Sequence, residues 1–351
     1  MSNTRSPNRW RPTCPPPRGL FRPVPVDPSA ARGPTRGQAQ GPHWRRTSHG
    51  LYVPAWVDTT FPEQRVLEQS MRLPSNGAVT GWAACLMHGA AFFDGLGRDG
   101  VTLLPVPLAC GPGSSIRDGA GSLVTRDRIA GEVLMVHGVP CVVPVRAVFD
   151  AVRYAPDVRE GVVAIDMMAA ARRVSISMLT TYLSRRRHWR GVRQVEQALL
   201  LASERSRSPY ESRMRLIWVL DAGYPTPLVN RAVFTTDGQF LGVGDLVDTE
   251  AAVFGEYDGA DHRSTVQHAA DLAREDRCRR ANLDFFRITG PDMRDRATAV
   301  ARMSNARQRG LRRDQSRDAW TLETPDWWQE EMTIDEEQEF KRWLHQPPAC
   351  G

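Results

Sequence analysis

Two short apolar runs that each end in carboxylates follow one another in residues 240–263, FLGVGDLVDTEAAVFGEYDGADHR. The first run contains Asp245, and the second ends with Glu256 and Asp258. Alternate residues of a strand share a face, so Glu256 and Asp258 point the same way. If the runs pair as a hairpin around an even-numbered loop, for example the four residues 248–251, Phe254 lies opposite Asp245, and Glu256 is then its diagonal neighbour. The three carboxylates could then reach one divalent cation through their oxygen atoms.

The alternative is a strand face that is exposed to solvent, with the carboxylates in water. The runs LGVG and AAVFG around the acids are too apolar for that, and four glycines remove side chains where another group could approach the backbone. Those glycines are Gly242, Gly244, Gly255 and Gly259. Burying like charges costs several kcal/mol per ion unless they are paired or bound to a metal. We therefore expect a metal site at these carboxylates.

The residues around this hairpin occur in the order and spacing of a known nuclease domain. They are Ser208–Arg215 (SPYESRMR), Asp245, Glu256–Gly259, His262, Asp271, Arg274 and Arg287. From Arg207 to Gly310 the chain resembles the domain similar to very-short-patch-repair endonucleases in the PD-(D/E)XK nuclease superfamily. The superfamily's usual third residue is a lysine, whereas this chain has Asp258, a departure that the related E-x-D-G-x-x-H branch shares.

The resemblance implies a restriction-endonuclease-like mixed sheet flanked by helices, and hydrolysis of DNA with Mg²⁺ or Mn²⁺. It implies metal ligands at Asp245 and Glu256. The catalytic residues that it implies are Glu211, Asp258, His262 and Arg274. Arg274 could hold the scissile phosphate with its guanidinium group.

Two of these residues have structural alternatives. Ser208, with Pro209 next and Glu211 three residues on, predicts a helix start with a capping box, so Glu211 could only close the cap. Arg274 could form a surface ion pair. Asp271 and Arg274 are spaced i, i+3 in a predicted helix and can face the same side.

The N-terminal part predicts a smaller α/β domain over residues 42–155, after a Pro/Arg-rich head (1–41) that we expect to be disordered. Residues 43–56 resemble the wing of AbiEi-type antitoxin proteins, and residues 78–89 resemble the helix that follows that wing. The helix-turn-helix that precedes the wing in those proteins is missing here. A strand pair that packs on the core is the alternative.

The rest of the chain offers weaker motifs. Residues 95–100 match G-x-G-x-x-G, but a strand-like run follows instead of a helix, so we reject a dinucleotide site. Residues 156–206 predict a helical connector, in which Trp189 within the basic segment 184–190 could stack on a base or end a solvated helix. The charged, Trp-containing tail (311–351) is expected to dock on something basic.

Composition narrows the function classes. The chain has 351 residues, a net charge of +6 and a single lysine, Lys341. Its six cysteines form no C-x-x-C pair, and no apolar window is long enough for a membrane span, so we expect a cytoplasmic protein with no membrane partner. The overall class is α/β (α+β).

These residues and resemblances support two functions. One is a metal-dependent DNA endonuclease, with DNA as its partner. The other is an AbiEi-type antitoxin or transcriptional regulator, with a cognate toxin as possible partner, in which the nuclease fold is a non-catalytic binding platform.

Overall fold

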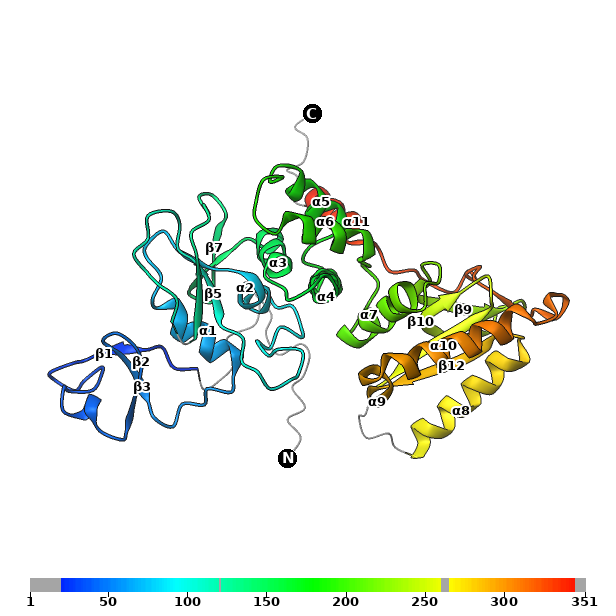
Figure 1. Ribbon diagram of the computed structural model, residues 1–351, viewed down its shortest axis with the longest axis horizontal. Coiled ribbons are helices and arrows are strands. Elements are labelled where there is room, and N and C mark those ends of the chain that lie inside the picture. The colour runs from blue at the N-terminus through cyan, green and yellow to red at the C-terminus, as the bar shows by residue number, and fades with distance from the viewer. Residues whose placement is uncertain (1–19, 120, 260–264, 345–351) are drawn as a thin grey trace. The chain divides into compact units, whose positions relative to one another are not determined.

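The computed structural model describes residues 20–119, 121–259 and 265–344, with the side chains of 265–272 and 343–344 excepted. The chain divides into an N-terminal unit, Met1–Leu200, and a C-terminal unit, Leu201–Gly351 (Figure 1). The described residues form three sheets and eleven α-helices, a mixed α/β architecture. Among the described helices, none has both the length and the apolar character that crossing a membrane requires.

Two sheets belong to the N-terminal unit. One has the order β1-β3-β2 and the other β6-β5-β4-β8-β7. The strands are β1 (Val24–Pro25), β2 (Trp44–Ser48), β3 (Leu51–Pro54), β4 (Ala78–Val79), β5 (Val106–Ala109), β6 (Ser122–Thr125), β7 (Val133–Val136) and β8 (Val139–Val142). The predicted strand pair at residues 43–56 is the antiparallel hairpin β2–β3. A 3-10 turn at Gln38–Gln40 precedes it, and the described residues 20–43 contain no α-helix.

Six helices complete this unit. They are α1 (Pro62–Ser70), α2 (Gly81–Met87), α3 (Pro144–Arg153), α4 (Val158–Ala170), α5 (Ile176–Ser184) and α6 (Val192–Leu201), whose last residue crosses the unit boundary. The helices α4 and α5 pack against α3, which buries Val148, Phe149 and Val152. The predicted connector 156–206 is therefore largely part of the N-terminal unit, because its apolar side chains complete the core around α3.

The Pro/Arg-rich head differs from its prediction where the structure describes it. Residues 1–19 lie outside the described residues, so their predicted disorder stays a prediction. From residue 20 on the chain is packed: Val24–Pro25 pairs with β3, and Phe21 N donates to Gln64 Oε1 at 2.8 Å. Gln64 Nε2 returns a bond to Phe21 O at 2.9 Å. These tertiary bonds hold a segment whose composition alone predicts no structure.

The C-terminal unit is built on one five-stranded sheet of order β12-β11-β10-β9-β13. The strands are β9 (Leu228–Thr235), β10 (Phe240–Asp248), β11 (Val253–Asp258), β12 (Asp284–Thr289) and β13 (Trp320–Thr321). The helices are α7 (Pro209–Leu216), continued by a π-helical turn at Ile217–Asp221, then α8 (Thr265–Arg280), α9 (Gly290–Arg294), α10 (Arg296–Leu311) and α11 (Ile334–Leu344); a 3-10 turn lies at Gln315–Arg317. The strands β9, β10 and β11 are antiparallel neighbours, and α8 carries the chain across to β12, which is parallel to β11.

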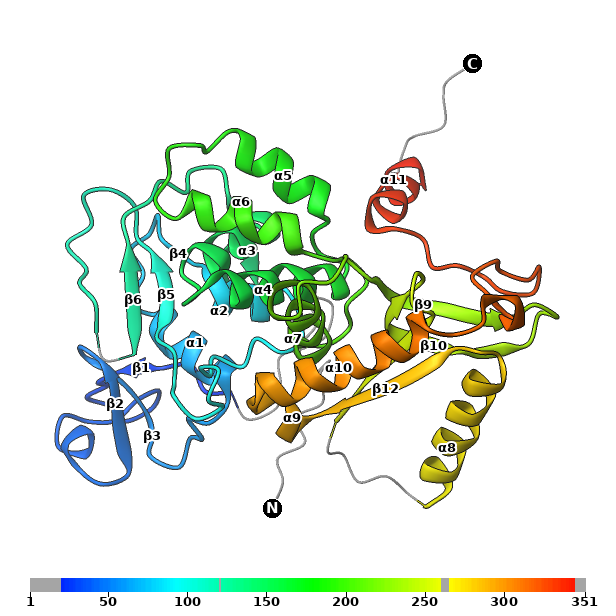
Figure 2. The same ribbon diagram turned by 45° about the vertical axis from the view of Figure 1, so that its right-hand side comes forward.

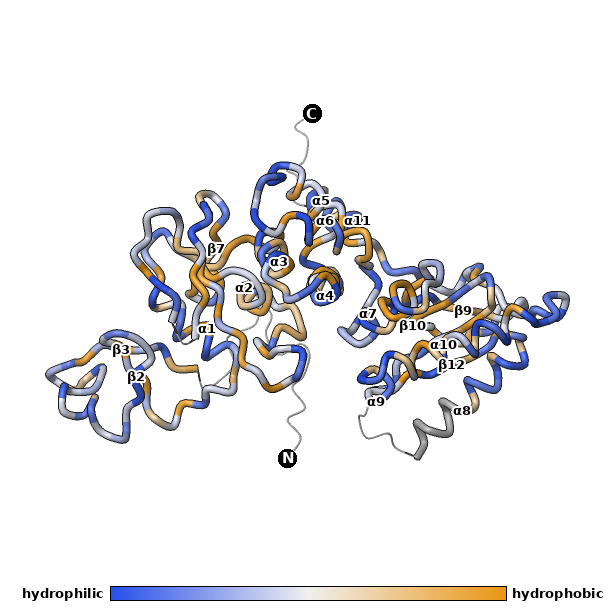
Figure 3. Tube along the Cα trace, in the orientation of Figure 1, coloured by the Kyte–Doolittle hydropathy of each residue, from blue (hydrophilic) through white to orange (hydrophobic). Residues whose placement is uncertain are grey.

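Helices cover both faces of this sheet, with α10 on one side and α8 on the other (Figure 2). On the first face Trp218 and Leu246 pack with Met303 of α10. On the second face Val247 and Phe254 pack with Cys278 of α8. The hydrophobic stretches follow the strands, whereas the described part of α8 is mostly hydrophilic (Figure 3). The central strands are therefore buried on both faces.

The C-terminal segment joins the sheet of its own unit. Trp320 pairs with Thr235 and Thr321 with Phe234, so β13 extends the sheet beyond β9. The indole of Trp328 stacks on Phe240 with ring centroids 5.2 Å apart. The tail thus packs on a strand edge and on aromatic rings. It also contacts a basic side chain, since Glu330 pairs with Arg231.

Candidate functional site

The two central strands of the C-terminal sheet separate at the predicted carboxylates. Strands β10 and β11 pair through Leu246–Gly255, Val247–Phe254 and Asp248–Val253, and the ladder stops there. Beyond it β10 remains paired with β9, and β11 with β12. Asp245 and Glu256 are the first residues past the last pair, one on each strand. The predicted pairing of Phe254 with Asp245 is wrong, because the loop lies one residue further on and Phe254 faces Val247.

The Asp245 carboxylate fills the gap between the separating strands. Its Oδ2 accepts a hydrogen bond from the backbone N–H of Tyr257 at 2.8 Å, where a strand carbonyl would otherwise accept. The predicted close approach at the glycines is present nearby: a Cβ on Gly242 or Gly244 would lie 3.1 Å from the ring of Phe254. Glycine at these positions of β10 therefore leaves room for the ring of Phe254.

The surroundings of Asp245 make its negative charge unfavourable. Burial raises the pKa of Asp245 to about 7, and the nearby charges of Glu211 and Glu256 add to this. The Tyr257 N–H and the Arg274 guanidinium oppose the rise without cancelling it. At neutral pH this carboxyl therefore exchanges a proton readily or favours a cation beside it.

Glu211 serves the helix cap and also faces the site. Ser208 Oγ accepts from Glu211 N at 3.2 Å, which caps α7 as predicted. The Glu211 carboxylate Oε2 accepts from Arg207 N at 2.8 Å and from Asn230 Nδ2 at 2.6 Å. Glu211 is the largest charge influence on Asp245, so it closes the cap and also lies near the predicted site. Its catalytic role stays a prediction.

Glu256 is held by arginines from two elements. Arg274 Nη2 of α8 lies 2.8 Å from Glu256 Oε1 and 2.9 Å from Oε2. Arg287 Nη2 of β12 lies 3.5 Å from Glu256 Oε2, and its Nε lies 3.8 Å from Asp258 Oδ2. Glu256 is buried, with 9% of its surface exposed, so these pairs are only weakly screened.

Arg287 keeps two donors that are ion-paired at long range but not hydrogen-bonded. Its Nε and Nη2 are buried, and within the described residues neither makes a hydrogen bond. Buried guanidinium donors of this kind usually have a hydrogen-bond partner. A ligand oxygen at the mouth of the strand gap could accept from them.

Two predicted residues are not placed by the structure. His262 lies outside the described residues, and Asp271 belongs to α8 but its side chain is not among those described. The structure brings together Glu211, Asp245, Glu256, Arg274 and, through Arg287, Asp258. Among the described residues, no three His, Cys, Asp or Glu side chains are already arranged around a common metal position. A cation at Asp245 would have to draw Glu256 away from its arginines.

No sequence pattern predicted a role for Asn230 or a partner for Arg287. Asn230 lies in β9 and has φ 46°, in the left-handed region. Its side-chain amide donates a hydrogen bond to the carboxylate of Glu211 in α7. The sequence carries one indication, because Asn230 and Arg231 interrupt an otherwise apolar strand. The pairing of Arg287 with Glu256 depends on the parallel register of β11 and β12, which no local pattern predicts.

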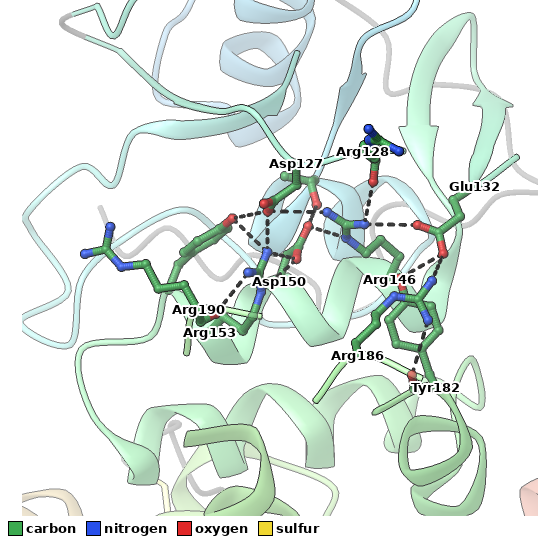
Figure 4. A network of polar contacts seen from close by, with 11 residues as sticks. Asp127, Arg128, Glu132, Arg146, Asp150, Arg153, Tyr182, Arg186 and Arg190 are labelled. Atoms are coloured by element: carbon green, nitrogen blue, oxygen red, sulfur yellow. Dashed lines mark hydrogen bonds and ion pairs between the residues drawn. The ribbon is translucent and has the colours of Figure 1, made fainter. Parts of the chain in front are cut away.

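A second charged cluster lies in the N-terminal unit (Figure 4). At its centre Asp150 accepts from Arg146 Nε at 2.7 Å and from Arg153 Nη2 at 2.6 Å. Thr80 Oγ1 donates to Asp150 Oδ2 at 2.6 Å. Arg146 and Asp150 are fully buried. The Asp150 carboxylate is fully satisfied, which favours a structural role for the cluster over a catalytic one.

The same cluster fixes the predicted base-stacking tryptophan. The guanidinium of Arg146 lies 4.6 Å from the ring centroid of Trp189, and that of Arg153 lies 5.1 Å from it. Phe149 contacts the ring edge-on at a centroid distance of 6.0 Å. Trp189 thus stacks on the protein's own arginines, and its segment closes the cluster instead of offering a ring to a base.

Comparison of the chain with protein-family models, with curated proteins and with solved structures finds no match. The likeness to the nuclease and antitoxin families therefore rests on the motif residues of this chain alone.

Proposed function

We propose that the C-terminal unit is a metal-dependent DNA endonuclease-like domain that hydrolyses phosphodiester bonds. The observation that carries this proposal is the separation of β10 and β11, which leaves Asp245 and Glu256 beside Arg274 and Arg287. Hydrolysis of a phosphodiester needs both an activated water and positive charge around the phosphate. A mixed sheet with helices on both faces agrees with the restriction-endonuclease-like fold that the motif residues imply.

Mg²⁺ or Mn²⁺ would be held by Asp245 and Glu256. Carboxylate oxygens are the ligands that these ions prefer. The pKa of Asp245 is raised by burial first and by the charges of Glu211 and Glu256 second, and a divalent cation beside Asp245 would relieve the cost of its negative charge. When bound, the cation would polarise the phosphate and acidify the attacking water.

The protein groups would position the phosphate and move protons. Arg274 and Arg287 present guanidinium groups that suit the geometry of phosphate oxygens, and Nε and Nη2 of Arg287 make no hydrogen bond within the described residues. Asp258, beside Arg287, and His262 would assist proton transfer. Glu211 would keep Asp245 basic through its nearby charge.

The test is nicking of supercoiled plasmid DNA by the full-length protein in Mg²⁺ or Mn²⁺. Glu256→Gln should abolish nicking, because it removes one ligand charge and keeps the shape of the side chain. It should also destabilise the metal-free protein by up to roughly 3–5 kcal/mol, because Arg274 and Arg287 lose their buried partner.

Asp245→Asn separates loss of activity from loss of folding, since it should abolish nicking while stabilising the metal-free protein at neutral pH. The control Glu323→Gln, at an exposed acid of the same unit, should nick as the wild type does. An Asp245→Asn protein that still nicks DNA would refute the proposal.

One observation favours a second candidate, a regulator of the AbiEi antitoxin kind that uses the nuclease fold as a binding platform. Glu256 is already neutralised by two arginines, as expected of a carboxylate that needs no cation. A wild-type protein that gains no stability from millimolar Mg²⁺ or Mn²⁺ and cuts no DNA would support this candidate. Binding of a cognate toxin would then be the activity to measure.

A further inference from the structure

Two arginines flank the carboxylate site on the side of α7 and β9. The backbone N–H of Arg207 donates to Glu211 Oε2, and Arg231 directly follows Asn230, whose amide donates to the same oxygen. The backbone of Arg207 thus holds Glu211 directly, and Arg231 is the neighbour in sequence of Asn230, which also holds Glu211. Their side chains extend outward: that of Arg207 is 58% exposed and that of Arg231 is 26% exposed.

The chain's own acidic C-terminal segment contacts both arginines. Glu330 Oε1 lies 2.7 Å from Arg231 Nη1, and Glu331 Oε1 lies 3.4 Å from Arg207 Nη2. Arg231 Nη2 also donates to the backbone carbonyl of Leu322 at 3.3 Å. The segment is anchored by β13, which pairs with β9, and by Trp328 on the ring of Phe234 at 5.3 Å.

Resting on the function proposed above, we propose that Arg207 and Arg231 bind the phosphate backbone of a nucleic acid as it enters the site, and that Glu330 and Glu331 occupy them in the unbound protein. A carboxylate and a phosphate oxygen offer a guanidinium group the same acceptor geometry. The two glutamates therefore mark where phosphates bind. The C-terminal segment acts as a competitor in the same chain, and a nucleic acid must displace it.

Displacement of the glutamates needs little energy because both are exposed, Glu330 by 47% and Glu331 by 79%. Pairs between solvent-exposed charges contribute little to stability, and a polyanion gains further from the release of its counterions. The anchors β13 and Trp328 keep the glutamates near the arginines after displacement, so the segment can return when the nucleic acid leaves. Competition of this kind is strongest at low salt.

The experiment measures binding of a fluorescent DNA duplex and of its single strand to the full-length protein in EDTA, where no hydrolysis occurs. Glu330→Gln/Glu331→Gln should bind roughly 2- to 10-fold more tightly at low salt, and the gain should shrink as salt rises. Arg207→Gln/Arg231→Gln should bind more weakly, with a salt slope lower by about 2. The control Glu323→Gln, an exposed acid in the same segment, should bind as the wild type does.

Unchanged affinity for DNA of Glu330→Gln/Glu331→Gln, or of Arg207→Gln/Arg231→Gln, would overturn this inference, even for a protein that nicks DNA. The expected affinity changes in a protein without nicking activity would support it and overturn only the hydrolytic function. Absence of DNA binding in the wild type and in every variant would overturn both.

Discussion

Replacing Asp245 by asparagine should stabilise the protein above neutral pH, which is unusual for a change in a candidate active site. Burial and the charges of Glu211 and Glu256 hold the pKa of Asp245 at about 7, above its ordinary value of 3.8. Asparagine is uncharged at every pH and can still accept from Tyr257 N through its side-chain oxygen. The substitution therefore removes the unfavourable charge and keeps the hydrogen bond.

The sign and the pH window follow from the two pKa values. Between about pH 4 and pH 7 the folded protein binds a proton at Asp245 that the unfolded chain does not, so the free energy of unfolding falls as pH rises through this window. With 1.36 kcal/mol per pKa unit, the full difference is about 4 kcal/mol, reached near pH 8. We expect Asp245→Asn to gain roughly 1–4 kcal/mol at pH 8 and nothing near pH 4.

Hydrogen exchange of the amides in β10 and β11, followed by mass spectrometry on the full-length chain, measures this gain within the C-terminal unit. Asp276→Asn, at an exposed acid of α8, is the matched control and should change the free energy by less than about 0.5 kcal/mol. Mg²⁺ should slow exchange in the wild type and not in Asp245→Asn. A gain that is equal at pH 5 and pH 8, or no gain at pH 8, would refute the reasoning.

The other predictions concern packing and charge elsewhere. Asp150→Asn should destabilise the N-terminal unit by roughly 3–5 kcal/mol, because Arg146 and Arg153 lose a buried counter-charge. The measurement is denaturant unfolding, with Glu196→Gln at an exposed acid as the control. Equal denaturant midpoints for Asp150→Asn and the wild type would contradict the buried network. Gly310→Ala should lower the melting temperature, since an added Cβ would run into the backbone carbonyl of Ala251 and cost about 1–3 kcal/mol, whereas Gly37→Ala, where a Cβ meets no atom, should not.

Local patterns predicted most of the helices and the strands that carry the site. The helices α3, α5 and α6 follow apolar spacing, and the cap at Ser208 follows from residue types alone. Residues 290–311 form two helices, α9 and α10, because Asp295 caps α10. Such a break moves no apolar residue out of the core, so periodicity does not reveal it.

The candidate site was predictable in its carboxylates and not in their partners. Alternation along the two strands, together with an even-numbered hairpin loop, suffices to bring Asp245 near Glu256. The register depended on Ala252, which takes φ 51° in the loop, a conformation that alanine rarely adopts. The ion pairs of Glu256 with Arg274 and Arg287 join segments that only the fold brings together. Strand β9 was missed because Asn230 and Arg231 break its apolar run.

The short strand β13 also covers the edge of the sheet that β9 would otherwise form. An unpaired strand edge is a template on which a second chain can add a strand and begin to aggregate. Here the edge next to β9 ends in two residues, Trp320 and Thr321, and Pro325 follows, which has no N–H to offer a further strand. Proteolysis ahead of Trp320 would uncover β9 together with the aromatic ring of Phe234. The residues from Trp320 to Pro325 therefore also cover the edge of the sheet at β9.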